Sequence, residues 1–191
     1  MTRPAIDRLG ARAEGEETRA MDNALVQRMI GAARLDVRTY EEVERDTSAT
    51  QQALIVVILA SVASGLGALD DGGMGLVGGV IAGIVGWAVL AAICYFVGTR
   101  LLGTENTQAD WGQLARTLGF AYTPNLLLIL GFIPVVDILV AIVVFFWGIA
   151  ATIIALRQAL DFSTGRAVAT AIISWVVSGI ALYSVIGLTH S

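Results

Sequence analysis

Residues 75–99 read GLVGGVIAGIVGWAVLAAICYFVGT and contain no Asp, Glu, Lys, Arg or His. An α-helix needs about 20 mostly apolar residues to cross the hydrocarbon core of a bilayer, which is about 30 Å thick. This run is long enough for one crossing and leaves some length for tilt. It predicts that the chain is an integral membrane protein built from α-helices.

Four further windows of the same kind flank this run. Of the 191 residues, 56% are hydrophobic and only 15% are charged, a balance far from that of soluble domains. The sequence therefore predicts an all-α fold, a polytopic membrane helical bundle over residues 47–191 with about five transmembrane helices. The expected spans are about 50–69, 75–99, 117–135, 138–157 and 166–189.

The first 46 residues have a different composition. They hold 18 of the 28 charged residues, so a polar tail precedes the membrane domain. Within residues 1–46, apolar side chains at helical spacing predict an amphipathic helix at about 21–43. This helix either lies in the lipid headgroup layer or packs on the rest of the protein or a partner, and both remain open. Its apolar residues are Met21, Leu25, Val26, Met29, Ile30, Ala33, Val37 and Tyr40.

The arginines predict the orientation of the chain, because short loops rich in Arg stay on the cytoplasmic side of a membrane. Arginine ends the tail at Arg45 and recurs in the loops 100–116 and 157–166, whereas the turns at 70–71 and at Asp137 carry none. This alternation predicts five crossings of the cell (inner) membrane, with a cytoplasmic N-terminus and an extracytoplasmic C-terminus.

The residues that the spans lack exclude several classes of function. None of the spans holds an ionisable residue in its interior, whereas ion-coupled transporters and carboxylate-dependent intramembrane proteases need such groups. One cysteine, Cys94, and one histidine, His190, are too few for a metal site. The net charge of −4 argues against nucleic acid as a partner. We therefore predict no enzyme activity and no cofactor, and no small-molecule substrate is identifiable.

Two rows of small residues are the predicted helix-packing surfaces. Small residues let helix backbones approach closely in a membrane, and hydroxyl groups can bond to a neighbouring helix or to their own. Each row either packs inside the bundle or contacts another molecule. The rows are Gly75, Gly79 and Gly83 in the second span and Thr170, Ser174 and Ser178 in the fifth.

The third span contains the sequence Tyr122-Thr123-Pro124-Asn125. Proline lacks a backbone N–H and frees a carbonyl group, so we expect a kink here, with polar groups at membrane depth. These four residues are the best candidates for a functional spot in the chain. The alternative is a kink that only shapes the bundle.

Three other positions are interpreted from local chemistry. Trp111 is typical of an anchor in the headgroup layer, because its ring is apolar and its N–H is polar. Pro134 and Asp137 favour a tight hairpin between the third and fourth spans, where the aspartate accepts from free N–H groups of the next helix. A buried functional carboxylate is the alternative role for Asp137.

Several short motifs, some in the loops and some within the third and fourth spans, form a further pattern. They are Arg34-Leu35-Asp36 through Tyr40-Glu41-Glu42-Val43-Glu44, Trp111 to Arg116, Gly119 to Pro124, Trp147-Gly148, Ala155 to Ala159, and Ser163 to Ala167. Together they resemble the bacterial branch of the Yip family, membrane proteins related to eukaryotic proteins that interact with Ypt/Rab GTPases. The resemblance covers roughly Met29 to the end of the chain. Its hallmark loop positions are Arg157, Asp161, Ser163, Gly165 and Arg166.

The resemblance implies a five-span domain with a cytoplasmic N-terminus, as the arginines do. The eukaryotic relatives act in vesicle trafficking by binding small GTPases and one another, and the resemblance supplies no catalytic residues. Our hypothesis is a non-enzymatic scaffold, partner-binding protein or accessory subunit, whose partners are the lipid bilayer and other membrane proteins or a second copy of itself. One alternative is a small-molecule or lipid facilitator that uses the kinked third span. Another is a membrane-surface organiser that acts through the tail helix.

Overall fold

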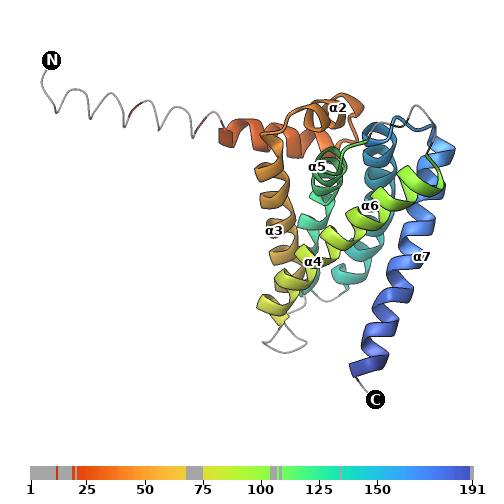
Figure 1. Ribbon diagram of the computed structural model, residues 1–191. Coiled ribbons are helices and arrows are strands. Elements are labelled where there is room, and N and C mark those ends of the chain that lie inside the picture. The colour runs from red at the N-terminus through yellow and green to blue at the C-terminus, as the bar shows by residue number, and fades with distance from the viewer. Residues whose placement is uncertain are drawn as a thin grey trace, which may run out of the picture.

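The computed structural model describes residues 12, 19, 21–67, 75–103, 107, 109–133 and 135–189, with the backbone alone for residues 75 and 181–189. Within these residues every regular element is a helix (Figure 1). The predicted all-α fold is therefore confirmed. After a first helix at 21–33, the elements are α2 (Val37–Arg45), α3 (Ala49–Gly67), α4 (Gly75–Phe96), the π-helix η2 (Val97–Leu101), α5 (Trp111–Ala121), the 3₁₀-helix η3 (Thr123–Phe132), α6 (Val136–Ala159) and α7 (Thr164–Thr189).

Three helical segments of the described chain are long and apolar enough to cross a membrane. They are Ala49–Gly67, Leu76–Leu101 and Val136–Ala159, and they correspond to the first, second and fourth predicted spans. The third predicted span is divided between α5 and η3, and the apolar part of α7 with described side chains ends at Ile180. The chain is thus a membrane protein with several apolar helices, and the count of five crossings stays a prediction.

The helix ends lie at two opposite sides of the bundle (Figure 1). Helix 21–33, α2, the start of α5 and the α6–α7 connection lie together at one side, which we call the arginine-rich end. The end of η3, the start of α6 and the end of α7 lie at the other side. The segments that carry arginine are thus gathered at the same end, as the predicted alternation requires.

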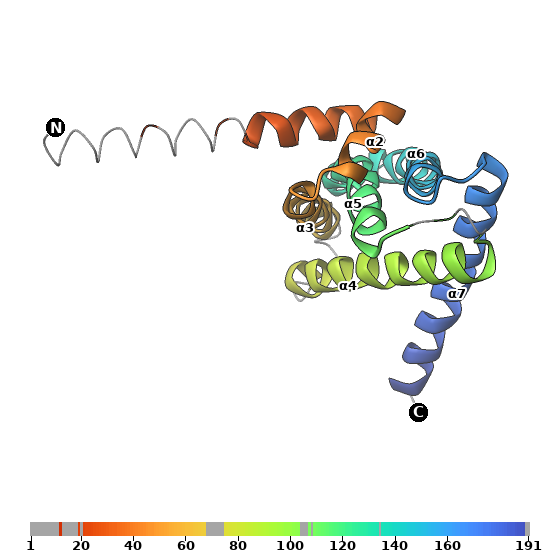
Figure 2. The same ribbon diagram turned by 45° about the horizontal axis from the view of Figure 1, so that its top comes forward.

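The prediction of one amphipathic helix at 21–43 is wrong, because a turn at residues 34–36 divides it into two helices (Figure 2). Leu35 has a φ of 60°, its N–H donates to the Ala32 carbonyl, and the Asp36 N–H donates to the Gly31 carbonyl, both at 3.0 Å. These bonds close the first helix as a Schellman turn. The Asp36 carboxylate then accepts from the Arg38 N–H at 3.0 Å and starts α2. The apolar spacing continues through the break, so periodicity does not reveal it.

The predicted third span also differs from the structure. Its helix, α5, begins at Trp111 rather than near residue 117, and the backbone changes from α to 3₁₀ at Tyr122. Pro124 occupies the first turn of η3, where its missing N–H breaks no helical bond. The Thr123 hydroxyl donates to the Phe120 carbonyl at 2.7 Å, which satisfies one acceptor at the change. The proline thus marks a change of helix type in the middle of this segment.

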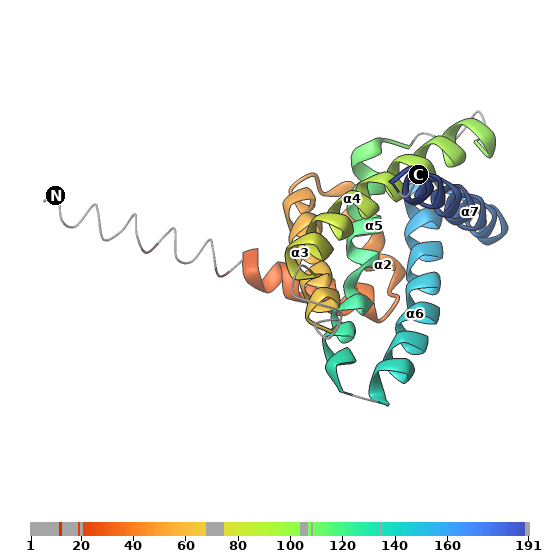
Figure 3. The same ribbon diagram turned by 90° about the horizontal axis from the view of Figure 1, so that it is seen from below.

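Helix α3 contacts α4, α5 and η3, and the closest of these contacts depend on glycines. A Cβ added to Gly119 of α5 would stand 2.8 Å from the Ala53 Cβ and 3.2 Å from the Ala53 carbonyl oxygen. At the far end of α3, a Cβ on Gly67 would overlap the Leu128 carbonyl of η3, and Gly131 packs on the Gly67 backbone. Viewed from below, α3 and α7 lie on opposite sides of the bundle (Figure 3).

Candidate functional site

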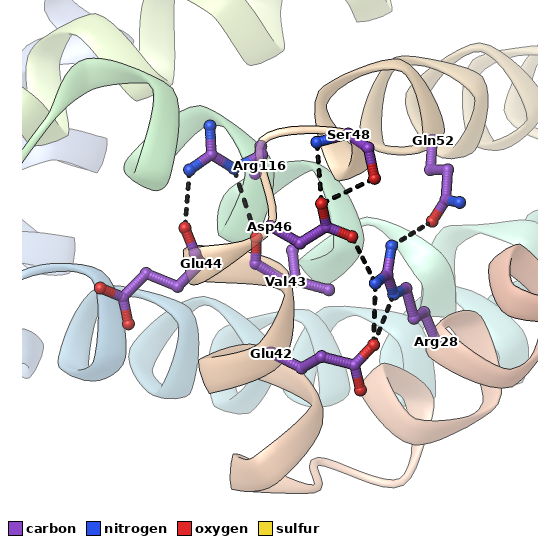
Figure 4. Close-up of polar contacts among 8 residues, drawn as sticks. All are labelled: Arg28, Glu42, Val43, Glu44, Asp46, Ser48, Gln52 and Arg116. Atoms are coloured by element: carbon purple, nitrogen blue, oxygen red, sulfur yellow. Dashed lines mark hydrogen bonds and ion pairs between the residues drawn. The ribbon is translucent and has the colours of Figure 1, made fainter.

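A polar cluster at the arginine-rich end joins the tail to the first span (Figure 4). The Arg28 guanidinium donates from Nε to the Glu42 carboxylate at 2.9 Å, from Nη1 to the Gln52 amide oxygen at 2.8 Å and from Nη2 to the Asp46 carboxylate at 2.6 Å. Only 11% of the Arg28 side chain is exposed. Helix 21–33, α2 and α3 are therefore tied together by one side chain.

Asp46 has a second role at the start of α3. One of its carboxylate oxygens accepts from the Ser48 N–H at 2.9 Å and from the Ser48 hydroxyl at 2.6 Å. The Ser48 hydrogen bonds, and then the Arg28 guanidinium, lower the pKa of the Asp46 carboxyl below its ordinary value. This carboxylate therefore stabilises the fold at neutral pH, and its contribution is lost as the pH falls through the lowered pKa.

Arg116 forms the second attachment of the tail (Figure 4). It lies inside α5 with 5% of its surface exposed, and it donates to the Glu44 carbonyl at 2.6 Å and to the Val43 carbonyl at 3.3 Å. A further bond of 3.4 Å reaches the Thr50 hydroxyl. The last carbonyls of a helix have no partner within it, and the planar guanidinium satisfies two of them at once. Arg116 therefore connects the end of α2 to α5.

The role of Arg116 was missed in the sequence, where it was assigned to the loop before the third span. The structure has a capping box at Asp110 and Gln113, with the Asp110 N–H donating to the Gln113 side chain at 2.8 Å. That motif, Asp-Trp-Gly-Gln, is the signal that places the start of α5 at Trp111 and Arg116 within a helix.

Glu44, at the end of α2, lies near a like charge. Burial, and then the nearby Asp161, raise the pKa of the Glu44 carboxyl. Because the Glu44 pKa is raised in the folded state, the contribution of this carboxyl to stability is largest below the ordinary glutamate pKa of about 4.3. That contribution falls as the pH rises through the folded-state pKa. The native protein therefore carries a charge penalty at neutral pH.

Replacing Glu44 with glutamine should raise the thermal unfolding temperature of the detergent-solubilised protein at pH 7. The reason is that the amide keeps the shape but removes the partly buried charge. The gain should shrink as the pH is lowered toward 4, where the native carboxyl is neutral too. Asp22→Asn, at an exposed position of helix 21–33, is the control. An equal gain at pH 4 and pH 7 would contradict the electrostatic origin.

The hallmark loop between α6 and α7 is a second Schellman turn. Asp161 has a φ of 50°, its N–H donates to the Gln158 carbonyl at 3.1 Å, and the Phe162 N–H donates to the Arg157 carbonyl at 3.0 Å. The Arg166 guanidinium donates to the Leu102 carbonyl after η2 and lies over the Phe162 ring at 4.6 Å. Arg166 thereby attaches the start of α7 to the end of η2.

The remaining hallmark positions have local roles. The Arg157 side chain is exposed in the last turn of α6, where a cation is favourable to the helix dipole. The Ser163 carbonyl accepts from the Arg166 and Ala167 N–H groups at the start of α7. A Cβ added to Gly165 would meet nothing within 4 Å. No reaction chemistry is built from these residues.

The predicted glycine row of α4 packs on α3. A Cβ on Gly83 would overlap the Ser61 side chain of α3, and one on Gly79 would stand 3.8 Å from the Gly65 Cα. Gly75 is described by its backbone alone. The inner face of α4 is therefore occupied by the protein's own first span.

A second small-residue row lies beside the first on α4, three residues further along the chain, and we call it the outer row. It consists of Gly78, Ala82 and Gly86, all exposed. A Cβ added to Gly78 or Gly86 would meet no atom within 4 Å. The spacing of four residues is the same as in the predicted row, so the sequence alone does not show which row is internal.

The row on α7 makes fewer bonds than its hydroxyls allow. Thr170 is fully buried and donates to the Arg166 carbonyl of its own helix at 2.9 Å. Ser174 is fully buried, and neither its hydroxyl nor that of Ser178 has a hydrogen-bond partner among the described residues. The one hydrogen bond that this row makes, from Thr170, therefore stays within α7.

The kink residues divide into two pairs. Thr123 and Pro124 are buried in the packing of η3, whereas Tyr122 and Asn125 line a cavity of about 380 Å³ that five helices border. We call this cavity the kink pocket. Its lining residues are Leu90, Ala121, Tyr122, Asn125, Val144, Phe145, Gly148, Ile149, Thr152 and Trp175.

The predicted interface residues lie near the two ends of the bundle. Trp111 is 40% exposed at the first position of α5 and packs edge-to-face on Tyr95, with 6.2 Å between the ring centroids. Asp137 lies in the first turn of α6 and accepts from the Ile138 N–H at 2.7 Å, after Val135 with a φ of 75°. Pro134 lies outside the described residues. Asp137 thus sits at the turn where a hairpin was expected.

These features define the chain as a polytopic, helical membrane protein with a folded N-terminal attachment and no assembled reaction site among the residues described. The sequence model of the Yip1 domain matches residues 36–186, which is most of the chain. The chain therefore belongs to the family defined by the Yip1 domain, as the motifs predicted. The match begins at Asp36, the N-cap of α2. No curated protein and no solved structure matches the chain.

Proposed function

We propose that this protein is a non-enzymatic, partner-binding membrane protein, and that the outer row of α4 is the surface on which it receives another transmembrane helix. The observation that carries this proposal is the division of α4 into two small-residue faces, of which only one is covered. Large side chains border the open face on the same helix. They are Val77, Ile81, Val85 and Val89, which are 70%, 58%, 54% and 44% exposed.

Helices associate in a bilayer for other reasons than in water. Lipid tails are as apolar as these side chains, so apolar burial does not drive helix association in a bilayer. Close backbone contact does, and it requires small residues four apart on an accessible face. The inner row already makes such a contact with α3 at Gly83 and Gly79. The outer row has the same spacing and nothing against it, which supports a second contact of the same kind.

The partner we assign to the outer row is the same row on a second copy of the chain. A two-fold axis beside α4 places the outer row of one copy against the outer row of the other, so both helices contribute the same small-residue surface. The two arginine-rich ends then face the same side of the membrane. Members of this family are usually described as membrane proteins that interact with Rab GTPases. We call helix 21–33 and α2 together the platform, and two paired platforms would form a scaffold for partner recognition of this kind.

This platform is firmly attached, which supports a recognition role for it. Besides the Arg28 and Arg116 contacts, Trp147 of α6 donates from Nε1 to the Ala33 carbonyl at 2.8 Å. The Tyr40 hydroxyl donates to the Ala32 carbonyl at 3.3 Å. Its outer surface keeps Met21, Val26 and Ile30 exposed by 52%, 51% and 41%.

The orientation belongs to the same proposal. We place the arginine-rich end on the cytoplasmic side of the cell (inner) membrane and the C-terminus outside, because the arginine-bearing segments share one end of the bundle (Figure 1). In this orientation the platform faces soluble cytoplasmic partners, while the outer row faces lipid.

Gly86→Leu should dissociate the proposed dimer of two chains. A leucine at this position fills the space that the partner backbone needs, so we expect at least roughly a tenfold weaker association. The measurement is crosslinking and mass analysis of the purified full chain in mild detergent over a range of concentrations. Gly179→Leu is the matched control, because a Cβ at Gly179 meets nothing within 4 Å and lies on another helix.

Two results would count against the proposal. One is an unmodified protein that stays monomeric at every concentration, and the other is an equal dimer fraction in Gly86→Leu and Gly179→Leu. Both variants should leave the fold of a single copy intact, because a Cβ at Gly86 or Gly179 meets no atom within 4 Å.

A further inference from the structure

The kink pocket is built where α5 gives way to η3, and α4, α6 and α7 contribute to it as well. The change of helix type places Tyr122 and Asn125 on its wall, Leu90 comes from α4, and Trp175 comes from α7. Its remaining wall is α6. The volume of about 380 Å³ lies within the usual range for small-molecule pockets.

Three uncharged polar side chains of the pocket lack partners. Within the part of the chain that the structure describes, the Tyr122 hydroxyl, the Asn125 side-chain amide and the Thr152 hydroxyl form no hydrogen bond to protein. Their polar atoms keep some accessible surface, because the fully buried and unpartnered side-chain polar atoms of the described residues are those of Trp87, Ser174 and Ser178. A polar group that lines a pocket without a protein partner is normally satisfied by water or a ligand.

The charge of the lining restricts the ligand. None of the pocket's lining residues is Asp, Glu, Lys, Arg or His, so a charged group inside would have no counter-ion. Most of the lining is aliphatic or aromatic. A ligand that fits this wall is therefore apolar over most of its surface and carries a neutral hydrogen-bonding group.

The position of the pocket restricts the route of entry. Gly148 and Trp175 lie close to the midpoints of the 24-residue α6 and the 26-residue α7. Phe145, at the rim, is 63% exposed on the outer surface of the apolar helix α6. A compound that reaches the pocket past Phe145 comes from the hydrocarbon layer.

We propose that the kink pocket binds an uncharged amphiphile from the bilayer, with its hydroxyl or ester group against Tyr122, Asn125 and Thr152 and its chain along α6. Diacylglycerol is the simplest common lipid of this chemical class. The outer row of α4 takes no part in this site, so the binding proposal is independent of the pairing proposal and each is tested without the other.

Photolabelling tests the site directly. The full chain is reconstituted in phosphatidylcholine vesicles that contain a diacylglycerol with a diazirine on one acyl chain, and labelled peptides are identified by mass spectrometry. We expect label on the α6 segment around Gly148 and on η3. Unlabelled diacylglycerol should compete for this label, and a plain alkane of equal chain length should not.

Gly148→Leu is the decisive variant. A Cβ at Gly148 meets nothing within 4 Å, so a side chain can start there, and leucine should fill part of the pocket. Pocket labelling should fall at least roughly tenfold, whereas the matched Gly179→Leu control should label like the native protein. Thr152→Val and Asn125→Leu, which remove polar groups at similar size, should each reduce labelling roughly fivefold, as expected for one lost hydrogen bond.

The proposal is overturned if Gly148→Leu and Gly179→Leu label equally, because the probe then reports only the lipid shell. It is also overturned if the alkane competes as well as diacylglycerol, because the three polar side chains then select nothing. Thr152→Val keeps the test decisive should Gly148→Leu fail to fold.

Discussion

Arg116→Met is expected to release α2 from the bundle and to lower the free energy of unfolding by about 3 kcal/mol. Methionine preserves most of the volume of the side chain but donates no hydrogen bond. The Val43 and Glu44 carbonyls, now joined to Arg116 at 3.3 and 2.6 Å, would lose their partner. Amide hydrogen exchange in detergent should report a large loss of protection across α2.

Two further variants test whether the paired guanidinium donors of Arg116 cause the loss of protection in α2. Arg116→Lys keeps the charge but not the planar pair of donors, so an intermediate loss is expected. Arg157→Met removes an exposed arginine from the same end of the bundle and should cost less than about 1 kcal/mol. If α2 kept native protection in Arg116→Met, the attachment would have to depend on Arg28 and the apolar contacts instead.

Gly119→Ala is expected to destabilise the contact between α3 and α5 by about 1–3 kcal/mol, the usual cost of overpacking a core. The added methyl would stand 2.8 Å from the Ala53 Cβ, and both atoms belong to buried helix positions that cannot turn aside. Alanine is the better helix former, so a simple propensity argument predicts the opposite sign. Thermal unfolding in detergent distinguishes the two.

A double substitution provides the control for this steric argument. Ala53→Gly removes the opposing methyl, so Gly119→Ala combined with Ala53→Gly should cost less than the sum of the two single changes. Gly179→Ala, where the methyl enters open space, should be neutral or slightly stabilising. Additive losses in the double variant would exclude a direct Gly119–Ala53 clash.

The sequence predicted the position and type of the apolar segments well where one residue class decides them. Long runs without charge identify α3, α4 and α6, since uncompensated charge is expensive in lipid. The break at Leu35 was missed because a Schellman turn normally uses glycine, and here the left-handed position is taken by leucine. The early start of α5 was missed because length and hydropathy outweighed its capping box.

The contacts between helices were harder to predict than the helices. A helix that is apolar on every face gives no periodic signal about which face is internal. The Gly79 and Gly83 row and the outer row therefore look alike until α3 is in place. The kink residues were singled out from proline chemistry, but the kink pocket depends equally on Thr152 and Trp175, far away along the chain. Only folding brings these residues together.

The 3₁₀ form of η3 has a consequence for length. Ten residues wound as a 3₁₀-helix rise about 20 Å, against about 15 Å for an α-helix. Together with α5, the segment extends about 36 Å, enough to cross a bilayer although neither part qualifies alone. Rewinding η3 into α form would draw the turn at Val135 inward by about 5 Å, which is one turn of helix. The 3₁₀ turns of η3 therefore supply about 5 Å of the length that this segment needs to match a bilayer.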